Sequence, residues 1–364
     1  MAAAALLPER MHGVLLTGFG GPEQLQYRED LPVPVPRAGE VLIRVSASSV
    51  NNTDINTRVG WYSKTVDGPT QDACLGFDAA TDLAPSWGGA AMQFPRIQGA
   101  DCCGHIAAVG AGVDSARIGQ RVLVRPVLRK PGAAPYDLDY FGSECDGGFA
   151  QYTRVPASAA MAVQSALSDA ELACLPCAHS TAENLLTRAG VQAGERVLIT
   201  GASGGVGSAA VQLAHLRGAQ VIAQADASKH AVLGTIGATH TLGRDADIVQ
   251  SLGKESVAVV IDLVGGPAWP NLLEVLQRGG RYATAGAIAG PMVTLDLRTL
   301  YLKDLQLLGC TWQEDAVFEQ LLGYVARGQL RPLLAQTYDL RDIAQAQAAF
   351  VAKRFVGKIA LKIP

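Results

Sequence analysis

One stretch near the middle of the chain, ITGASGGVGSAAVQLA at residues 199–214, constrains the fold more than any other. An apolar strand leads into a run of small residues, and an apolar helix follows at once. Such a turn is typical of dinucleotide-binding folds, in which backbone amides and a helix N-terminus hold a pyrophosphate. Gly204 would let the backbone approach the phosphates, and Gly207 would let the helix pack closely on the sheet. Ala202 stands where the pattern usually has its first glycine.

The residues around this turn predict two different architectures along the chain. From about residue 180, predicted strands at 196–200, 220–225, 257–265 and 281–287 alternate with predicted helices, which indicates a parallel sheet. Between residues 11 and 156, short β-branched runs are broken by Gly and Pro, which favours a mostly antiparallel β domain. The tail FVGKIALKI is predicted to be a strand that returns to this first domain. The loops at 63–95 and 128–148 are longer than ordinary connections.

Composition limits the classes of function. A chain of 364 residues that is 49% hydrophobic and 17% charged is expected to be globular, with two domains. Its net charge of −3 gives no electrostatic reason to expect nucleic acid or an anionic membrane as partner. No apolar run is long enough to span a bilayer. Seven cysteines, an odd number, are typical of reduced thiols, so we expect a cytoplasmic protein.

Several segments, taken in order, resemble a known family. They are VNNTDINTRVGWY, IQGADCCGHIAAVGAGV, CLPCAHSTAENLL, GASGGVG and GGRYATAGAIAG. Together they resemble the medium-chain dehydrogenase/reductase superfamily, in its zinc-free, quinone-oxidoreductase-like branch. The resemblance implies an α/β protein with a GroES-like β-barrel catalytic domain at 1–178, completed by 316–364. A Rossmann domain with a doubly wound parallel sheet would span 179–315, and the active site would lie in the cleft between the two.

The end of the second strand of the parallel sheet bears on the choice of cofactor. Counting along the strand places Asp226 one residue beyond its tip, with Ser228 and Lys229 positioned for a 2′-phosphate. We therefore expect NADP(H). NAD(H) stays open, because a shift of one residue would bring Asp226 to the ribose. Further contacts with the cofactor are expected from the glycine turn and the neighbouring segments, at Thr181, Ala202, Ser203, Gly204, Gly205, Val206, Gly207, Val264, Gly286, Ala287, Ile288 and Lys358.

The same resemblance argues against a metal. In zinc alcohol dehydrogenases of the superfamily, a Cys, a His followed by Glu, and a later Cys surround the catalytic zinc. Here these positions correspond to Asn51, Ala100, Asp101 and Cys177, so three protein ligands are not available. Neighbouring Cys102 and Cys103 would point to opposite faces of a strand and are better interpreted as small buried residues. We expect no zinc, and hence substrates already polarised by conjugation.

Four residues are candidates for catalysis. Tyr62 matches the acid tyrosine of mitochondrial-type enoyl reductases, although it could equally be a wall of the pocket. Asn51 and Thr53 are candidates for hydrogen bonds to substrate, and His179 for relaying a proton or for a purely structural role. Asp54 is predicted to be structural.

The main hypothesis is an NAD(P)H-dependent reductase that transfers hydride to a conjugated C=C bond or a quinone of a small-molecule substrate. A zinc-independent alcohol dehydrogenase or carbonyl reductase, and a non-catalytic NADPH-binding protein, stay open. By resemblance, we expect a homodimer or homotetramer, paired through the segment AIAGPMVTLDLRTLYLKDLQLLG.

Overall fold

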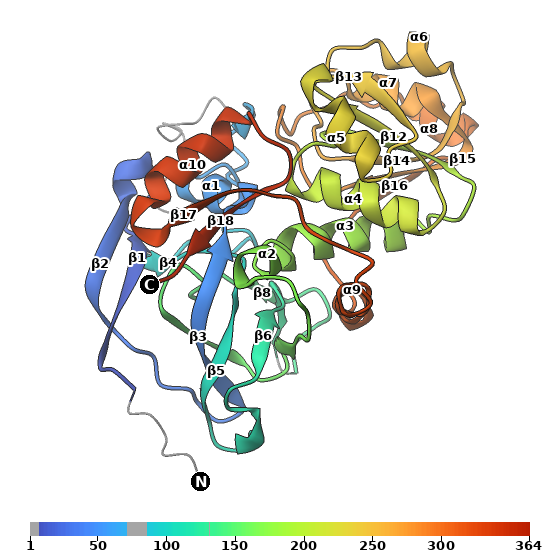
Figure 1. Cartoon of the computed structure of the whole chain (residues 1–364). Coiled ribbons are helices and arrows are strands. Elements are labelled where there is room, and N and C mark those ends of the chain that lie inside the picture. Colours follow the sequence, from blue (N-terminus) through green and yellow to red (C-terminus); the bar gives the residue numbers. More distant parts are fainter. Residues whose placement is uncertain (1–6, 71–85, 131) are drawn as a thin grey trace.

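The computed structural model describes residues 7–70, 86–130 and 132–364. Figure 1 shows two bodies, a β-rich half built mainly from the first part of the chain and a half in which helices cover a parallel sheet. The predicted fold class, a GroES-like barrel with a Rossmann sheet, is confirmed. Part of the long loop at 63–95, including Cys74, lies outside the described residues.

The second half contains one six-stranded sheet in which every neighbouring pair of strands is parallel. Its strand order is β13-β12-β11-β14-β15-β16, the doubly wound order expected of a dinucleotide fold. All six residues of β14 are buried, because helices cover both faces. The strands are β11 (Arg196–Ile199), β12 (Gln220–Ala225), β13 (His240–Gly243), β14 (Val257–Asp262), β15 (Leu276–Thr284) and β16 (Gln306–Gly309).

The helices of this half connect those strands. The glycine turn leads into α4, which begins at Gly205 as the sequence pattern predicts. The helix predicted after β12 is present, but its first turn is the short 3-10 helix η4 (Ala227–Lys229). The helices are α3 (Pro176–Arg188), α4 (Gly205–Leu216), α5 (His230–Thr235), α6 (Ile248–Leu252), α7 (Trp269–Val275), α8 (Leu297–Leu302) and α9 (Asp315–Ala326).

The first half consists of antiparallel strands that close around a second core. Its largest sheet has the order β10-β6-β5-β3-β18-β17, and β9 also pairs with β3. A smaller sheet joins β2, β1 and β4, and β7 pairs with β8. The strands are β1 (Arg10–Leu16), β2 (Leu25–Pro32), β3 (Glu40–Ser49), β4 (Arg96–Ile97), β5 (Cys103–Val109), β6 (Arg121–Val124), β7 (Val127–Arg129), β8 (Leu138–Tyr140), β9 (Tyr152–Pro156) and β10 (Ala160–Ala162).

The last part of the chain returns to this first half. Strand β18 (Lys358–Lys362) pairs antiparallel with β3, with Ala360 opposite Ser49, and β17 (Leu334–Asp339) runs parallel to β18. Helix α10 (Ile343–Ala352) connects the two strands. Near β3 lie helix α1 (Asn52–Val59) and the short α2 (Asp169–Leu172). Helix α3 runs continuously through the boundary expected at 178/179, and the exact division of the domains stays a prediction.

Apolar packing joins the halves. One core cluster contains residues of the parallel sheet and of α3 together with Ala47, Cys103 and Leu123 of the barrel strands. Cys102 and Cys103 are both fully buried, as predicted, and burial raises the pKa of the Cys103 thiol far above its ordinary value. No helix of the described ranges is long and apolar enough to cross a membrane.

Candidate functional site

The glycine turn at the end of β11 leaves space on one side and none on the other. A Cβ atom added at Gly207 would lie 2.2 Å from the carbonyl oxygen of Gly201 and 2.6 Å from Cα of Ala202, so only glycine fits there. A Cβ at Gly204 would meet nothing closer than that same oxygen, at 3.5 Å. Gly204 is the N-cap of α4 and has no side chain with which to cap the helix. The residues therefore fit a bound pyrophosphate, which would approach this N-terminus from the open side.

A group of cations lies beside that turn, at the end of β12. The Lys229 Nζ donates to the carbonyl oxygen of Lys353, at 2.6 Å, and to Oγ of Ser203, at 3.4 Å. Asp226 is exposed, and its Oδ1 accepts hydrogen bonds from the backbone N–H and the hydroxyl of Ser228, so this loop is held by its own residues. Sequence reasoning missed Lys353, which belongs to the segment after α10 and carries no local motif.

The side chain of Lys353 lies near Lys229 and contacts residues of the first half. Its Nζ donates to Oδ1 of Asn52, at 3.2 Å, and lies 3.6 Å from the centroid of the Phe350 ring. Burial, together with the nearby charges of Lys358 and Lys229, lowers the pKa of Lys353 to about 7. Two lysine amines thus lie where the two halves meet beside the turn, and a bound anion there would favour their protonated forms.

The remaining predicted cofactor residues line the carboxyl ends of the parallel strands. The N–H of Val264 donates to Oδ1 of Asp262, at 3.0 Å, and the N–H of Ala289 donates to the carbonyl of Val264, at 2.9 Å. This contact connects the loop after β14 with the turn that holds Gly286, Ala287 and Ile288. From the other half, Thr70 donates its N–H to the carbonyl of Ile288, at 3.2 Å, so the turn is also linked to the long loop at 63–95.

Asp262 holds this edge of the sheet together and was not predicted. It is fully buried, and its carboxylate accepts hydrogen bonds from the hydroxyls of Thr200, at 2.5 Å, and Tyr282, at 2.6 Å. It therefore ties the ends of three adjacent strands, β11, β14 and β15, to one another. A single aspartate at the end of a strand is a weak signal in sequence, because its partners come from other strands. Thr181 lies on α3, where its hydroxyl donates to the carbonyl of Cys177, at 2.7 Å.

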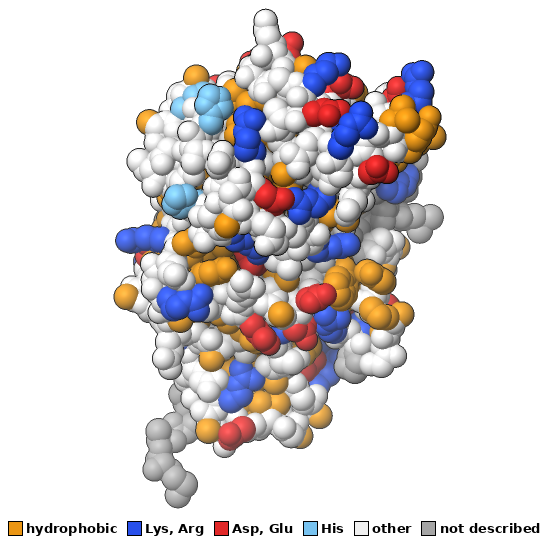
Figure 2. All heavy atoms as spheres, turned by 90° about the vertical axis from the view of Figure 1, so that its right-hand side faces the viewer, with side chains coloured by type: hydrophobic (Ala, Val, Ile, Leu, Met, Phe, Trp, Pro, Cys, Tyr) orange, Lys and Arg blue, Asp and Glu red, His pale blue; other side chains and the backbone are white. Residues whose placement is uncertain are grey.

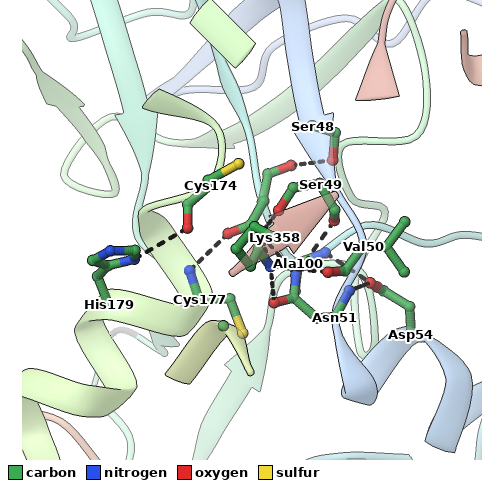
Figure 3. Close-up of polar contacts among 12 residues, drawn as sticks. Ser48, Ser49, Val50, Asn51, Asp54, Ala100, Cys174, Cys177, His179 and Lys358 are labelled. Carbon is green, nitrogen blue, oxygen red and sulfur yellow. Dashed lines mark hydrogen bonds and ion pairs between the residues drawn. The ribbon is translucent and has the colours of Figure 1, made fainter. Parts of the chain in front are cut away.

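On the barrel side, a buried network surrounds Asp101, and Figure 3 labels its partners Ser49, Asn51, Cys177 and Lys358. Its carboxylate accepts from the hydroxyl of Ser49, the Asn51 amide (2.7 Å), the backbone N–H of Cys177 (2.7 Å) and the Lys358 ammonium (3.1 Å). The Lys358 Nζ also donates to Oδ1 of Asn51 and to the carbonyl of Val50. Burial alone would lower the pKa of Lys358, but Asp101 and the nearby thiols outweigh it, and the pKa is raised.

This network bears on the roles that the sequence predicted for Lys358 and Asn51. Lys358 was expected to reach the cofactor phosphates, yet its ammonium points away from the glycine turn, toward Asn51 and Asp101. Asn51 was expected to bind substrate, yet its amide nitrogen already donates to Asp101 and, at 3.4 Å, to the carbonyl of Ser49. A hydrogen bond donated by Asn51 to substrate would require one of these bonds to break.

Tyr62 and Thr53, two of the predicted catalytic residues, are brought together. The phenol of Tyr62 donates to Oγ1 of Thr53, at 3.1 Å, and its ring packs edge-to-face against Trp61. Burial raises the pKa of Tyr62 well above its ordinary value, so the phenol keeps its proton at neutral pH. Asp54 belongs to a capping box at the start of α1, as its predicted structural role requires, and burial raises its pKa to about 7.

His179 lies apart from this pair. It is 1% exposed, and its Nδ1 faces the carbonyl oxygen of Cys174, at 3.2 Å, so the ring proton belongs on Nδ1. Burial, with a contribution from the Lys358 charge, lowers the pKa of His179 to about 4. Its Nε2 is buried without a hydrogen-bond partner among the described residues. The structure records no hydrogen bond from His179 to Tyr62 or Thr53 within that part of the chain.

The residues at the positions of the zinc ligands do gather, but their chemistry does not suit zinc. Ala100 offers no donor, and the Asp101 carboxylate already accepts four hydrogen bonds, one of them from an ammonium. Burial raises the pKa of the Cys177 thiol well above its ordinary value, whereas zinc binds the thiolate. Across residues 7–70, 86–130 and 132–364, no three His, Cys, Asp or Glu side chains are grouped as metal ligands.

Comparison with known proteins finds a matching family model for each half. Residues 37–165 match the family model of the alcohol dehydrogenase GroES-like domain, and residues 205–327 match that of the zinc-binding dehydrogenases. An acryloyl-coenzyme A reductase of Metallosphaera sedula is 29% identical over 348 residues, which cover 90% of this chain and 93% of that protein. A quinone oxidoreductase of Lama guanicoe is 28% identical, with 92% of each chain covered.

Solved structures agree with this placement. The structure of a putative alcohol dehydrogenase from Sinorhizobium meliloti is 44% identical, covers 98% of each chain and superposes with a TM-score of 0.87. A thermostable alcohol dehydrogenase from Pyrobaculum aerophilum, described with bound cobalt and zinc, is 29% identical over 97% of this chain and 99% of its own, with a TM-score of 0.81.

Proposed function

Because this chain belongs to the medium-chain dehydrogenase/reductase superfamily and is quinone-oxidoreductase-like, we propose that it is an NADPH-dependent reductase of conjugated substrates that works without zinc. Its substrates would be small enones, enals or quinones. One observation carries this proposal: Asn51 and Asp101, which stand at the zinc site of metal-dependent relatives, both accept hydrogen bonds from the Lys358 ammonium. Without a Lewis acid, the substrate must already be polarised by conjugation.

When bound, the nicotinamide supplies the hydride, and the protein supplies orientation and a proton. Hydride addition to the β-carbon of an enone leaves negative charge on the carbonyl oxygen, which needs a hydrogen-bond donor, while the α-carbon needs a proton. The Tyr62 phenol is protonated at neutral pH and donates its one hydrogen to Thr53, so the hydroxyl must turn from Thr53 toward the substrate when it acts. We assign to Tyr62 the role of this donor or acid, with Thr53 as its positioning partner.

Preference for NADPH is supported by the cations beside the glycine turn. Lys229 lies near Ser203, and Arg244 and Lys353 are close enough to take part in the electrostatic environment around Lys229. An additional phosphate on the adenosine ribose would find positive charge there, which NADH cannot use. One oxygen of the Asp226 carboxylate, Oδ1, accepts hydrogen bonds from Ser228.

A substrate panel with both cofactors tests the proposal. We expect oxidation of NADPH with enones, enals or quinones, and slower turnover with NADH. Gly204→Val should weaken NADPH binding by about 100-fold, because a side chain on the open face would occupy the path of the pyrophosphate. The circular dichroism spectrum and unfolding midpoint should be retained. Unchanged affinity in this variant would remove the turn from the site.

A second candidate is reduction of isolated ketones, or the reverse oxidation of alcohols. It is favoured by the name of the Sinorhizobium meliloti structure, a putative alcohol dehydrogenase at 44% identity. Turnover of ketones but not of enals or quinones would establish this alternative. Tight NADPH binding without turnover of any compound in the panel would instead indicate a non-catalytic nucleotide-binding protein.

We further propose that the protein is a homodimer or homotetramer. Within the described residues β16 pairs with β15 alone, and the adjoining segment exposes large apolar side chains: Met292 at 72%, Leu297 at 64% and Tyr301 at 61%. The face in Figure 2 carries hydrophobic side chains among its charged ones, mainly toward the right-hand side. An open apolar edge favours pairing with a second copy. A monomeric mass in light scattering at micromolar concentration would contradict this.

A further inference from the structure

Lys358 has two ends with different surroundings. Its ammonium lies in the barrel network, where it donates to the carbonyl of Val50 (2.9 Å), to Oδ1 of Asn51 and to Oδ2 of Asp101 (3.1 Å). The residue is 1% exposed. An ammonium has three hydrogens, and each has an acceptor here, so this group has no donor left for a substrate. In Figure 3 the side chain points toward Asn51, at the end of β3.

The aliphatic stem of Lys358 touches the other half of the molecule. A Cβ atom added at Gly205 would lie 2.6 Å from Cδ of Lys358 and 3.3 Å from its Cγ. Gly205 is the first residue of α4 and belongs to the glycine turn. Gly357, which precedes Lys358 in the chain, donates its N–H to the carbonyl of Ser203, at 2.9 Å. The beginning of β18 is therefore packed directly against the turn that would hold the pyrophosphate.

The charged end also fixes the orientation of Asn51. Because Oδ1 of Asn51 accepts from Lys358, the amide nitrogen must face the opposite way, where it donates to Asp101. Asp101 in turn holds the backbone N–H of Cys177, in the first turn of α3. Any movement of the Lys358 stem would consequently reach α3 and the residues before α1.

We propose that Lys358 is a positioning residue that couples the dinucleotide-binding turn to the Asn51–Asp101 network of the barrel. A change in the position of the turn moves the lysine stem. The ammonium passes this movement on to Asn51, Asp101 and the start of α3. The proposal rests on the proposed function only in taking the glycine turn as the cofactor site. Lys358 contacts no reacting atom, because its three hydrogens are bonded to protein oxygens.

The contact between stem and turn is tested first, without cofactor, by a double-mutant cycle of Gly205→Ala and Lys358→Ala. A methyl group at Gly205 collides with the lysine stem, so Gly205→Ala should lower Tm by several degrees, roughly 2–4 °C for each kcal/mol lost. In the Lys358→Ala background the same change should lower Tm by less than about 1 °C, because the stem is gone. Equal shifts in the two backgrounds would overturn the contact.

Two further variants keep this test sound. Gly234→Ala on α5, where an added Cβ meets nothing within 4 Å, is the control for adding a methyl group to a helix; it should not lower Tm, because alanine favours a helix more than glycine does, and it should leave activity unchanged. Lys358→Ala leaves the Asp101 carboxylate buried without its cation and could fail to fold. In that case the cycle is measured with Lys358→Ala combined with Asp101→Asn as the background, in which no charge is left unpaired.

Transmission to the barrel is tested by hydrogen exchange at the Cys177 amide, which donates to Asp101. We expect saturating NADPH to slow this exchange at least about fivefold in the wild type, and by less than about twofold in the Lys358→Ala background. Equal slowing in both would refute the coupling. If NADPH does not bind the wild type at all, the proposed function fails, while the cofactor-free cycle still decides whether stem and turn are in contact.

Discussion

The glycine turn and the Asp101 network lie at opposite ends of the Lys358 side chain, yet they are built in opposite ways. The turn consists of consecutive residues, 199–207, and what it offers is backbone with open space at Gly204. The network consists of side chains far apart in the chain, since Asn51 and Lys358 are separated by 307 positions, and its polar groups are bonded to one another. One side is prepared for a ligand, and the other is already satisfied.

This difference predicts which measured property a substitution will change. A substitution in the open part of the turn should reduce the affinity for cofactor and leave stability largely intact. A substitution in the network should reduce stability first, because it leaves a buried group without its partner. Catalytic and binding variants can therefore be distinguished by whether the unfolding free energy or the ligand affinity changes.

The largest effect is expected from Asp101→Ala. The variant leaves the Lys358 ammonium buried with no carboxylate, which should cost about 3–5 kcal/mol of unfolding free energy. Urea denaturation measures this loss. Asp30→Ala, which breaks the exposed Arg28–Asp30 pair, is the matched control and should behave like the wild type. If the two variants were equally stable, the network would not be the tightly coupled unit described here.

His179 is expected to make the unfolding free energy depend on pH. Its pKa is about 4 in the folded protein, below the ordinary 6.5, so the unfolded state takes up the proton first as pH falls. Its contribution to stability is present above pH 6.5 and is lost progressively down to about pH 4, by at most about 3 kcal/mol. His179→Gln should remove this slope.

The measurement for His179 is the difference in unfolding free energy between the wild type and His179→Gln from pH 7 to 4. Asp54 titrates over part of this range with the opposite sign, since its pKa is raised to about 7 and its ionised form is disfavoured in the fold. That contribution is common to both proteins and cancels in the difference. A constant difference across the range would mean that His179 is protonated in the folded state.

Tyr62→Phe tests the proposed role of Tyr62 as hydrogen-bond donor or acid. It removes one hydroxyl and keeps the ring against Trp61, so the unfolding midpoint should barely change. Loss of a donor or acid should lower kcat for an enone by about 10²-fold, or about 2.7 kcal/mol of activation free energy. A quinone should be affected less, because water can protonate its oxygens. Tyr338→Phe on β17 controls for loss of a hydroxyl. An enone rate within about twofold of the wild type would make Tyr62 only a wall of the pocket.

The smallest effect is expected at the cations beside the turn. Lys229→Ala removes a charge near Ser203 and should narrow the ratio of NADPH to NADH affinity by about tenfold. Lys254→Ala, an exposed lysine paired with Glu274 on the far side of the sheet, should leave the ratio unchanged. Fluorescence titration with both nucleotides gives the answer. Equal affinities already in the wild type would favour NAD and an interaction of Asp226 with the ribose.

Local patterns were sufficient for most of the Rossmann half. The turn, β11 and α4 follow one another within about twenty residues, and α9 begins at Asp315, as predicted. β15 begins at Leu276, five residues before the predicted Arg281, because residues 277–279 are exposed and carry no apolar signal. The partners of Asp101 could not be predicted, since a buried aspartate looks the same in sequence whether it meets an ammonium or a metal. Lys353 was missed for a similar reason: only the return of the chain after α10 brings it to the turn.

Strand β18 has a consequence for the order in which the protein can form during synthesis. It lies between β3 and β17 in the barrel sheet, although residues 358–362 come after the whole parallel sheet along the chain. The parallel sheet, made from residues 196–309, can assemble while the barrel is still missing this inner strand. Until then β3 keeps an unpaired edge next to the residues that surround Asp101. The nucleotide-binding half is therefore available as a finished surface on which the barrel is completed.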